Sequence, residues 1–124
     1  MIRGLGELES TIMDWLWALR RPASVRDVLE GLRQERVIAY TTVMTVMDNL
    51  HTKGLLKRRP VGRAYVYETV ASKEAYTAGL MRSALAGSGN QAATLVHFLE
   101  QLTPEEAAAL EAALQVFPPG GRPA

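Results

Sequence analysis

The stretch TTVMTVMDNLHTKG, residues 41–54, is the part of the chain from which the fold is most directly interpreted. At about 100° per residue its apolar side chains fall on one stripe, which predicts an amphipathic helix. This stripe consists of Val43, Val46, Met47 and Leu50. The opposite face is small and polar and consists of Thr41, Thr45, Asp48 and Thr52, flanked by Thr42 and Asn49. A helix that only covers a core usually carries long charged side chains outside, so this face is suited to approaching a partner closely.

The next segment, KGLLKRRPVGRAYVYET at residues 53–69, has the pattern of a β-hairpin. Residues 55–59 and 63–69 are rich in strand-forming side chains, and Pro60-Val61-Gly62 is predicted to form the turn between them. Side chains alternate along the second strand, so one face of the hairpin can pack while the other stays in water.

This hairpin is also basic. Residues 53–63 contain five basic residues and no acidic one, namely Lys53, Lys57, Arg58, Arg59 and Arg63. Charge on edge strands also prevents aggregation, but that role predicts mixed charge or Lys alone. Cations without acids at the strand ends and the turn favour contact with phosphates.

Charge is unevenly divided along the 124 residues. Residues 1–70 contain eleven Lys or Arg and eight Asp or Glu, whereas residues 71–124 contain three and five. The total of +1 therefore conceals two halves of opposite sign. Local positive charge is what a surface facing a nucleic acid needs. The composition, 48% hydrophobic and 22% charged, is typical of a folded soluble protein.

Two further helices are predicted before residue 41. Apolar side chains recur at helical spacing from residue 7 to about residue 20. Ser24, with Asp27 three residues later, is a variant of the capping box and begins a second, short helix. Residues 34–38 form the turn into the third helix. This order indicates a helix-turn-helix, and the basic hairpin after it indicates the winged form, which presents a helix and a ribbon to DNA.

From residue 71 the chain has few charges and much alanine, and three short helices are predicted. Ser72 and Asn90 are candidate caps of the first two, and Thr103 followed by Pro104 begins the third. Three short helices cannot easily bury a core of their own. Their apolar faces can pack against the first domain or, as the commonness of two-fold dimers favours, in a homodimer. The candidate dimer contacts are Tyr76, Leu80, Met81, Leu85, Leu95, Phe98, Leu99, Leu102, Leu110 and Leu114.

Three stretches occur in the same order and spacing in a known family: LGELESTIMDWLW, AYTTVMTVMDNLHTKGLL and AATLVHFLEQLTPEEAAALEAAL. Together they resemble the penicillinase-repressor family, the BlaI/MecI type that controls β-lactamase and methicillin-resistance genes. The resemblance covers roughly residues 5–115. It implies a mainly α fold with a small β-hairpin wing: a winged helix-turn-helix DNA-binding domain at 1–70 and a three-helix dimerisation domain at 71–117. The last residues, PPGGRPA at 118–124, are predicted from their composition to be a flexible tail. The resemblance also implies repression by two-fold binding to an inverted-repeat operator in double-stranded DNA.

Carried onto this chain, the resemblance starts the recognition helix near Ala39-Tyr40 and places Arg63 in the wing. The candidate DNA contacts are Tyr40, Thr41, Thr42, Thr45, Asn49, Lys53, Lys57, Arg58, Arg59 and Arg63. Staphylococcal members are inactivated when a membrane sensor triggers cleavage before a Phe in the second dimerisation helix. The matching bond is His97–Phe98, with His97 where those members have Asn, and a sensor-linked protease is the implied partner. The copper-responsive branch of the family uses C-terminal cysteines. Because this chain has no cysteine, copper sensing is not expected.

No cofactor, metal site or enzymatic activity is expected. Thiolate metal sites are excluded because the chain has no cysteine, and its two histidines lie in different predicted domains. No apolar run reaches the roughly 18 residues of a membrane span, and no signal peptide is visible, so a cytoplasmic location is expected. The alternative to a repressor is a winged-helix module for protein interaction, in which apolar or acidic residues replace the basic hairpin. The cations of residues 53–63 argue against it.

Overall fold

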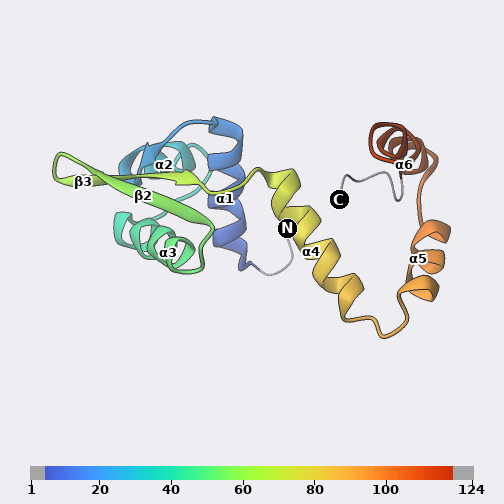
Figure 1. The fold of residues 1–124 in the computed structure, drawn as a ribbon. Helices are drawn as coiled ribbons and strands as arrows, with labels where there is room; N and C mark the ends of the chain where they lie inside the picture. Colours follow the sequence, from blue (N-terminus) through green and yellow to red (C-terminus); the bar gives the residue numbers. More distant parts are fainter. Residues whose placement is uncertain (1–4, 119–124) are drawn as a thin grey trace. The chain divides into compact units, whose positions relative to one another are not determined.

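The computed structural model describes residues 5–118. Residues 1–4 lie outside this part, as do residues 119–124, which make up most of the predicted tail. The helices and strands are α1 Glu7–Leu19, β1 Ala23–Ser24, α2 Val25–Leu32, α3 Tyr40–Thr52, β2 Leu56–Val61, β3 Ala64–Thr69, α4 Lys73–Ala86, α5 Gln91–Glu100 and α6 Pro104–Val116 (Figure 1). The predicted mainly helical fold with a small hairpin is confirmed. The chain divides into two compact units between Met81 and Arg82, a point that lies within α4.

The core of the first unit lies between α1, α2, α3 and the sheet. Its buried hydrophobic side chains are Leu5, Ile12, Met13, Leu16, Ala23, Val25, Val28, Leu29, Leu32, Val43, Met47, Leu50, Leu56 and Tyr67. The apolar stripe predicted for residues 41–54 is confirmed: Val43, Met47 and Leu50 are 0% exposed, and Val46 is half-buried. Because this stripe is held in the core, the opposite side of α3 faces outward.

Local hydrogen bonds begin α2 and end α1. The Ser24 hydroxyl accepts from the Asp27 N–H at 3.1 Å, and the Asp27 carboxylate accepts from the Ser24 N–H at 3.0 Å. This confirms the predicted capping box. At the end of α1, Arg20 takes a left-handed conformation with φ 59°, and its N–H donates to the Leu16 carbonyl at 3.2 Å. Residues 20–22 are therefore sufficient to turn the chain from α1 into β1.

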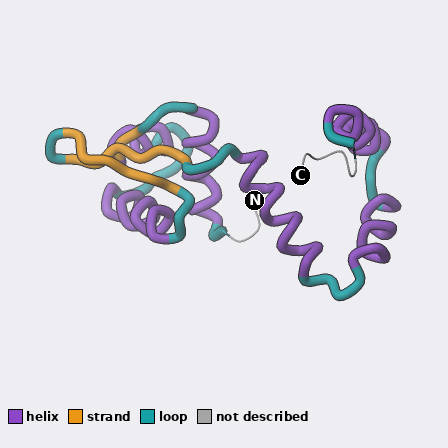
Figure 2. The backbone as a smooth tube through the Cα atoms, viewed as in Figure 1, coloured by secondary structure: helices purple, strands orange, loops and turns teal. Residues whose placement is uncertain are grey.

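The sheet has three antiparallel strands in the order β1-β3-β2 (Figure 2). The sequence did not indicate β1, because its two residues are too short for a period-two pattern. The predicted turn was wrong: Pro60 and Val61 belong to β2, and Gly62 with Arg63 connects the strands. Gly62 has φ 61°, which a tight hairpin requires, and Pro60 is tolerated because β2 lies at the edge of the sheet.

The β3–α4 connection is attached to α1 by side-chain contacts. The indole N–H of Trp17 donates to the Ala71 carbonyl at 2.9 Å, and its ring centroid lies 5.7 Å from that of Tyr76. The Lys73 ammonium lies 2.9 Å from the Asp14 carboxylate. The start of α4 therefore packs on the first unit, and Tyr76, predicted as a dimer contact, contributes to this packing.

The helix starts predicted beyond residue 71 are confirmed. The Ser72 hydroxyl accepts from the Ala75 N–H at 3.1 Å, and Asn90 and Thr103 accept in the same way from the N–H groups of Ala93 and Glu106. None of residues 82–118 is buried. The large apolar side chains that α5, α6 and the residue after them expose are Leu95, Val96, Phe98, Leu99, Leu114, Val116 and Phe117. The second unit therefore forms helices without enclosing a core.

Candidate nucleic-acid interface

The outward side of α3 is a continuous polar face. Its exposed side chains are Tyr40, Thr41, Thr42, Met44, Thr45, Asp48, Asn49 and Thr52. All five residues of α3 predicted to contact DNA are in this set. Ala39 precedes the helix and has no side chain that can cap it, so the first N–H groups of α3 are open to an external acceptor such as a phosphate. The face carries neither Lys nor Arg.

Met44 is an exposed apolar residue that the sequence interpretation did not select. Its side chain is 42% exposed, close to the 40% of Tyr40 one turn earlier. The apolar pattern of the segment hides such a residue, because methionine is commonly counted with the core. Its helical position, about 100° from the middle of the buried stripe, is the signal that places it outside. Met44 therefore adds an apolar side chain to a face whose other groups are hydroxyls, an amide and the carboxylate of Asp48.

The pleat of the hairpin separates the cations of the wing. In the β2–β3 register, Arg58 is opposite Tyr67, and both side chains lie on the face of the sheet that is turned toward α3. Lys57 and Arg59 precede and follow Arg58, so they project from the other face. Arg63 occupies the turn at the end of the hairpin, which Figure 1 shows extending past the helices of the first unit. The five cations do not form one patch.

Three of these cations are paired with carboxylates. Lys53 lies 2.8 Å from Glu9, and the pKa of Glu9 is lowered by this hydrogen bond and by that from the Gly6 N–H. Ion pairs at 3.5 Å and 2.9 Å join Lys57 to Glu68 and Arg58 to Asp48. Within residues 5–118, Arg59 and Arg63 make no ion pair. The cations free to meet a phosphate are thus those nearest the end of the hairpin.

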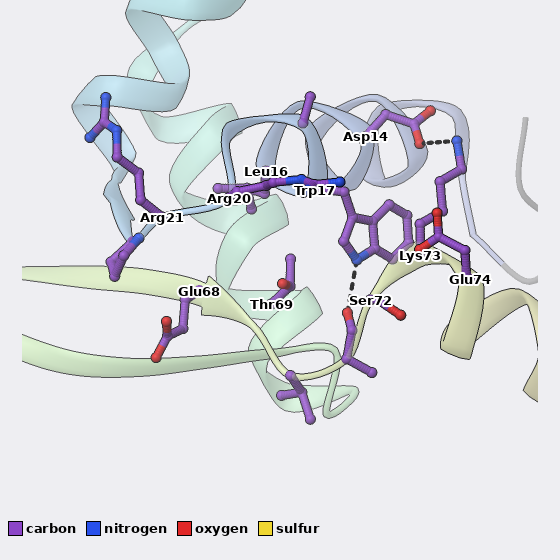
Figure 3. A pocket seen from close by; sticks show the side chains of 14 residues that line it. Asp14, Leu16, Trp17, Arg20, Arg21, Glu68, Thr69, Ser72, Lys73 and Glu74 are labelled. Carbon is purple, nitrogen blue, oxygen red and sulfur yellow. Dashed lines mark hydrogen bonds and ion pairs between the residues drawn. The ribbon is translucent and has the colours of Figure 1, made fainter.

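An open depression of about 910 Å³ lies where the β3–α4 connection crosses the end of α1. Figure 3 shows Trp17 and the Asp14–Lys73 pair on one side of it, with Arg21 and Glu68 on the other. None of the ten residues predicted to contact DNA lines this depression. It is a consequence of how the connection is attached to α1, and it is separate from the face of α3.

Residues 5–118 contain no group of three or more His, Asp or Glu side chains that could hold a metal ion. No helix among them is both long and apolar enough to cross a membrane. The absence of a cofactor stays a prediction.

Comparisons with known proteins bear on the family and on the fold. The family model described as penicillinase repressor matches residues 5–116. The transcriptional regulator BlaI of Mycobacterium tuberculosis is 45% identical over 113 residues, which cover 89% of this chain and 82% of that protein. The solution structure of the DNA-binding domain of the repressor BlaI superposes with a TM-score of 0.50 at 22% identity, covering 59% of this chain and 88% of that one. This last likeness confirms the winged-helix fold.

The relatives also bear on the class of protein. The family is one of repressors and the mycobacterial relative is a transcriptional regulator, so the prediction that the chain is not an enzyme is confirmed. The resemblance stated for residues 5–115 coincides with the family match over residues 5–116. With that match and 45% identity across most of both chains, the protein belongs to the penicillinase repressor family of BlaI-type transcriptional regulators.

Proposed function

We propose that the protein is a dimeric repressor that binds an inverted-repeat operator in double-stranded DNA, with α3 in the major groove. The observation that carries the proposal is the open threonine face of α3 beside a hairpin that ends in free arginines. A helix entering the major groove and a basic ribbon on the flanking backbone are the two contacts that a winged helix makes. The cations would fix the position of the protein, and α3 would read the sequence.

The chemistry of α3 favours thymine over guanine in direct readout. Thr41, Thr42 and Thr45 each offer a hydroxyl to phosphates or base edges and a methyl group to the thymine methyl, and Met44 adds a second kind of apolar contact. Asn49 can bond an adenine edge in two places. With no Lys or Arg on this face to bond guanine, the shape of the DNA would supply part of the specificity.

Phosphate contacts are assigned first to Arg59 and Arg63. Lys53, Lys57 and Arg58 would each have to leave a carboxylate before bonding a phosphate. Exposed ion pairs are weak, at about 0–1 kcal/mol, so Lys57, whose pair with Glu68 is exposed on both sides, can be recruited by DNA at small cost. Lys53 is held more firmly, because the Glu9 side chain is only 14% exposed and accepts from Lys53 through both carboxylate oxygens. Arg58 also contacts the side chains of Tyr65 and Tyr67, so DNA would have to break more than one ion pair to recruit it.

The homodimer is supported by the second unit. Its described residues enclose no core, and α5 exposes Leu95, Phe98 and Leu99. Contiguous exposed apolar surface of this kind marks an interaction site. A second copy of the chain would cover it symmetrically and would present two α3 helices to two half-sites about one helical turn apart. The dimer and the inverted repeat are therefore parts of one proposal.

Two single substitutions separate the roles assigned to the wing and to α3. Arg63→Ala is expected to weaken binding to every duplex similarly and to reduce the salt slope of log K by about 0.9, because one phosphate contact is lost. Thr45→Ala is expected to leave that slope unchanged and to cost about 1 kcal/mol of discrimination at one base pair. Titrations of operator and random duplexes at several salt concentrations measure both effects.

Arg82→Ala is the matched control for Arg63→Ala, because it removes the same charge outside the winged-helix unit. Its salt slope should equal that of the unsubstituted chain. If Arg63→Ala and Thr45→Ala both bind like the unsubstituted chain, the two roles are wrongly assigned.

Relief of repression is proposed to occur by proteolysis at the His97–Phe98 bond. This bond lies inside α5, where Phe98 is 41% exposed and His97 is exposed beside Glu100. Cleavage would separate α6 and the end of α5 from the rest of the chain and so remove most of the proposed dimer surface. A protease would need α5 to unwind locally, which a helix without a buried side can do readily.

Intact-mass measurement tests this route. In cells treated with a β-lactam, the chain is expected to yield a fragment ending at His97 while the target genes are induced. A variant carrying Phe98→Ala should stay full-length if the protease requires Phe at this position. Induction of the target genes with only full-length chain present would rule out cleavage as the cause.

Genome-wide recovery of DNA bound to the protein tests the whole proposal. Peaks centred on an inverted repeat upstream of a β-lactamase or other cell-wall-stress gene are expected. Peaks at unrelated genes would retain the DNA-binding dimer and remove the antibiotic connection. Absence of any enriched motif would favour the protein-interaction module instead.

A further inference from the structure

Arg58 has more partners than any other cation of the hairpin. Its Nη1 donates to the Asp48 carboxylate at 2.9 Å and to the Tyr67 hydroxyl at 3.4 Å. Its guanidinium carbon lies 4.4 Å from the centroid of the Tyr65 ring. The side chain is 27% exposed, against 63% for Lys57 on the other face of the hairpin. A guanidinium stacked on an aromatic ring and bonded on its edge is held in one orientation.

The partners of Arg58 come from two different elements. Tyr65 and Tyr67 are on β3, and their rings are 6.5 Å apart in an edge-on arrangement. Asp48 is on α3, on the same outward side as Thr41 and Thr45. Within residues 5–118, the Arg58–Asp48 bond is the one ion pair between α3 and the hairpin. It therefore links α3, which would contact the bases, to the hairpin, which would contact the phosphates of the DNA backbone.

The carboxylate of Asp48 is unfavourable for DNA binding by itself. It is 57% exposed on a face proposed to enter a groove lined by phosphates, where a negative charge is repelled. A simple anion-binding face would lack this residue. Its presence is accounted for if Asp48 acts on Arg58, since the pair is locally neutral and sets the distance between α3 and the wing.

We propose that Asp48 and Arg58 form a brace that positions the wing relative to α3, so that Arg58 is a positioning residue and not a phosphate ligand. The inference rests on the proposed DNA-binding function and assigns a part of it. The brace fixes the hairpin relative to α3 before DNA binds. The arginines at the end of the hairpin can then reach the DNA backbone while the threonines of α3 lie in the major groove. The brace contributes to specificity because only a correctly spaced site satisfies both contacts.

Asp48→Asn tests the brace because the two roles of Arg58 predict opposite signs. If Arg58 is a phosphate ligand, removing the charge of Asp48 frees it and tightens binding to all duplexes. If the pair is a brace, Asp48→Asn weakens binding to the inverted repeat by about threefold to tenfold, although the protein has become more positive. Affinity for a random duplex of equal length should not fall. The probe is a duplex carrying the repeat recovered in the genome-wide experiment.

Arg58→Lys is a second test of the brace. It keeps the charge but loses the stacking and the planar fork, so the same loss of affinity for the repeat is expected, with the salt slope unchanged. The double variant should be no weaker than either single one, because each breaks the same link. Glu68→Gln is the matched control: it removes a carboxylate from the wing, where it pairs with Lys57 on the opposite face, and should not weaken binding to the repeat.

The outcomes separate the brace from the proposed function. Tighter binding of Asp48→Asn to both duplexes would overturn the brace and leave the DNA-binding function standing. An equal loss on both duplexes, with a lower unfolding temperature, would overturn it too, because that result indicates a general loss of structure. If the unsubstituted chain binds no duplex, the proposed function fails and the brace fails with it.

Discussion

Replacing Leu50 with Ala is expected to lower the free energy of unfolding by about 2–5 kcal/mol. Leu50 is 0% exposed on the core side of α3, packed among side chains of the other helices. Removing its buried methyl groups loses their transfer free energy and leaves a cavity that the close-packed surroundings can only partly fill. Urea titration of the full-length chain, followed by circular dichroism, measures the change.

Thr45→Ala is the matched control for Leu50→Ala. Thr45 lies on the same helix as Leu50 but is exposed, so the free energy of unfolding of this variant is expected to change by no more than about 0.5 kcal/mol. A loss below about 1 kcal/mol for Leu50→Ala would contradict the packing of α3 described above. The comparison also shows whether a loss of DNA binding in Thr45→Ala has a cause other than unfolding.

Leu99→Asp is expected to weaken operator binding by roughly a hundredfold or more, through loss of the dimer. Leu99 is 53% exposed on α5, so the monomer tolerates a carboxylate there. In a two-fold interface the substitution would bury two charges without partners, which costs several kcal/mol in total. Sedimentation should show monomers at concentrations where the unsubstituted chain is dimeric.

Gln91→Asp introduces the same charge in the first turn of α5, where a carboxylate suits the helix dipole. This variant should remain dimeric and bind the operator normally. If Leu99→Asp still sediments as a dimer, Leu99 is outside the interface. If the unsubstituted chain itself sediments as a monomer, the homodimer proposal fails.

The helices of this protein could be predicted from the sequence because their causes are local. The spacing of Val43, Met47 and Leu50 indicates which side of α3 is buried before any neighbour is known. Ser24 with Asp27, and Thr103 with Glu106, form caps within four residues of chain. The order of the helices and the basic hairpin after them predicted a winged helix, and the likeness to the DNA-binding domain of the repressor BlaI confirmed this fold.

Three features were decided only by the tertiary structure. The two residues of β1 become a strand because β3 lies beside them, and the hairpin turn moves to Gly62 and Arg63 because the register of β2 with β3 requires it. The sequence showed a uniform run of cations, but the pleat turned Arg58 toward Asp48, while Lys53 met Glu9, 44 positions away. Which charges remain free depends on distances between residues remote in sequence, and those distances exist only after the core has packed.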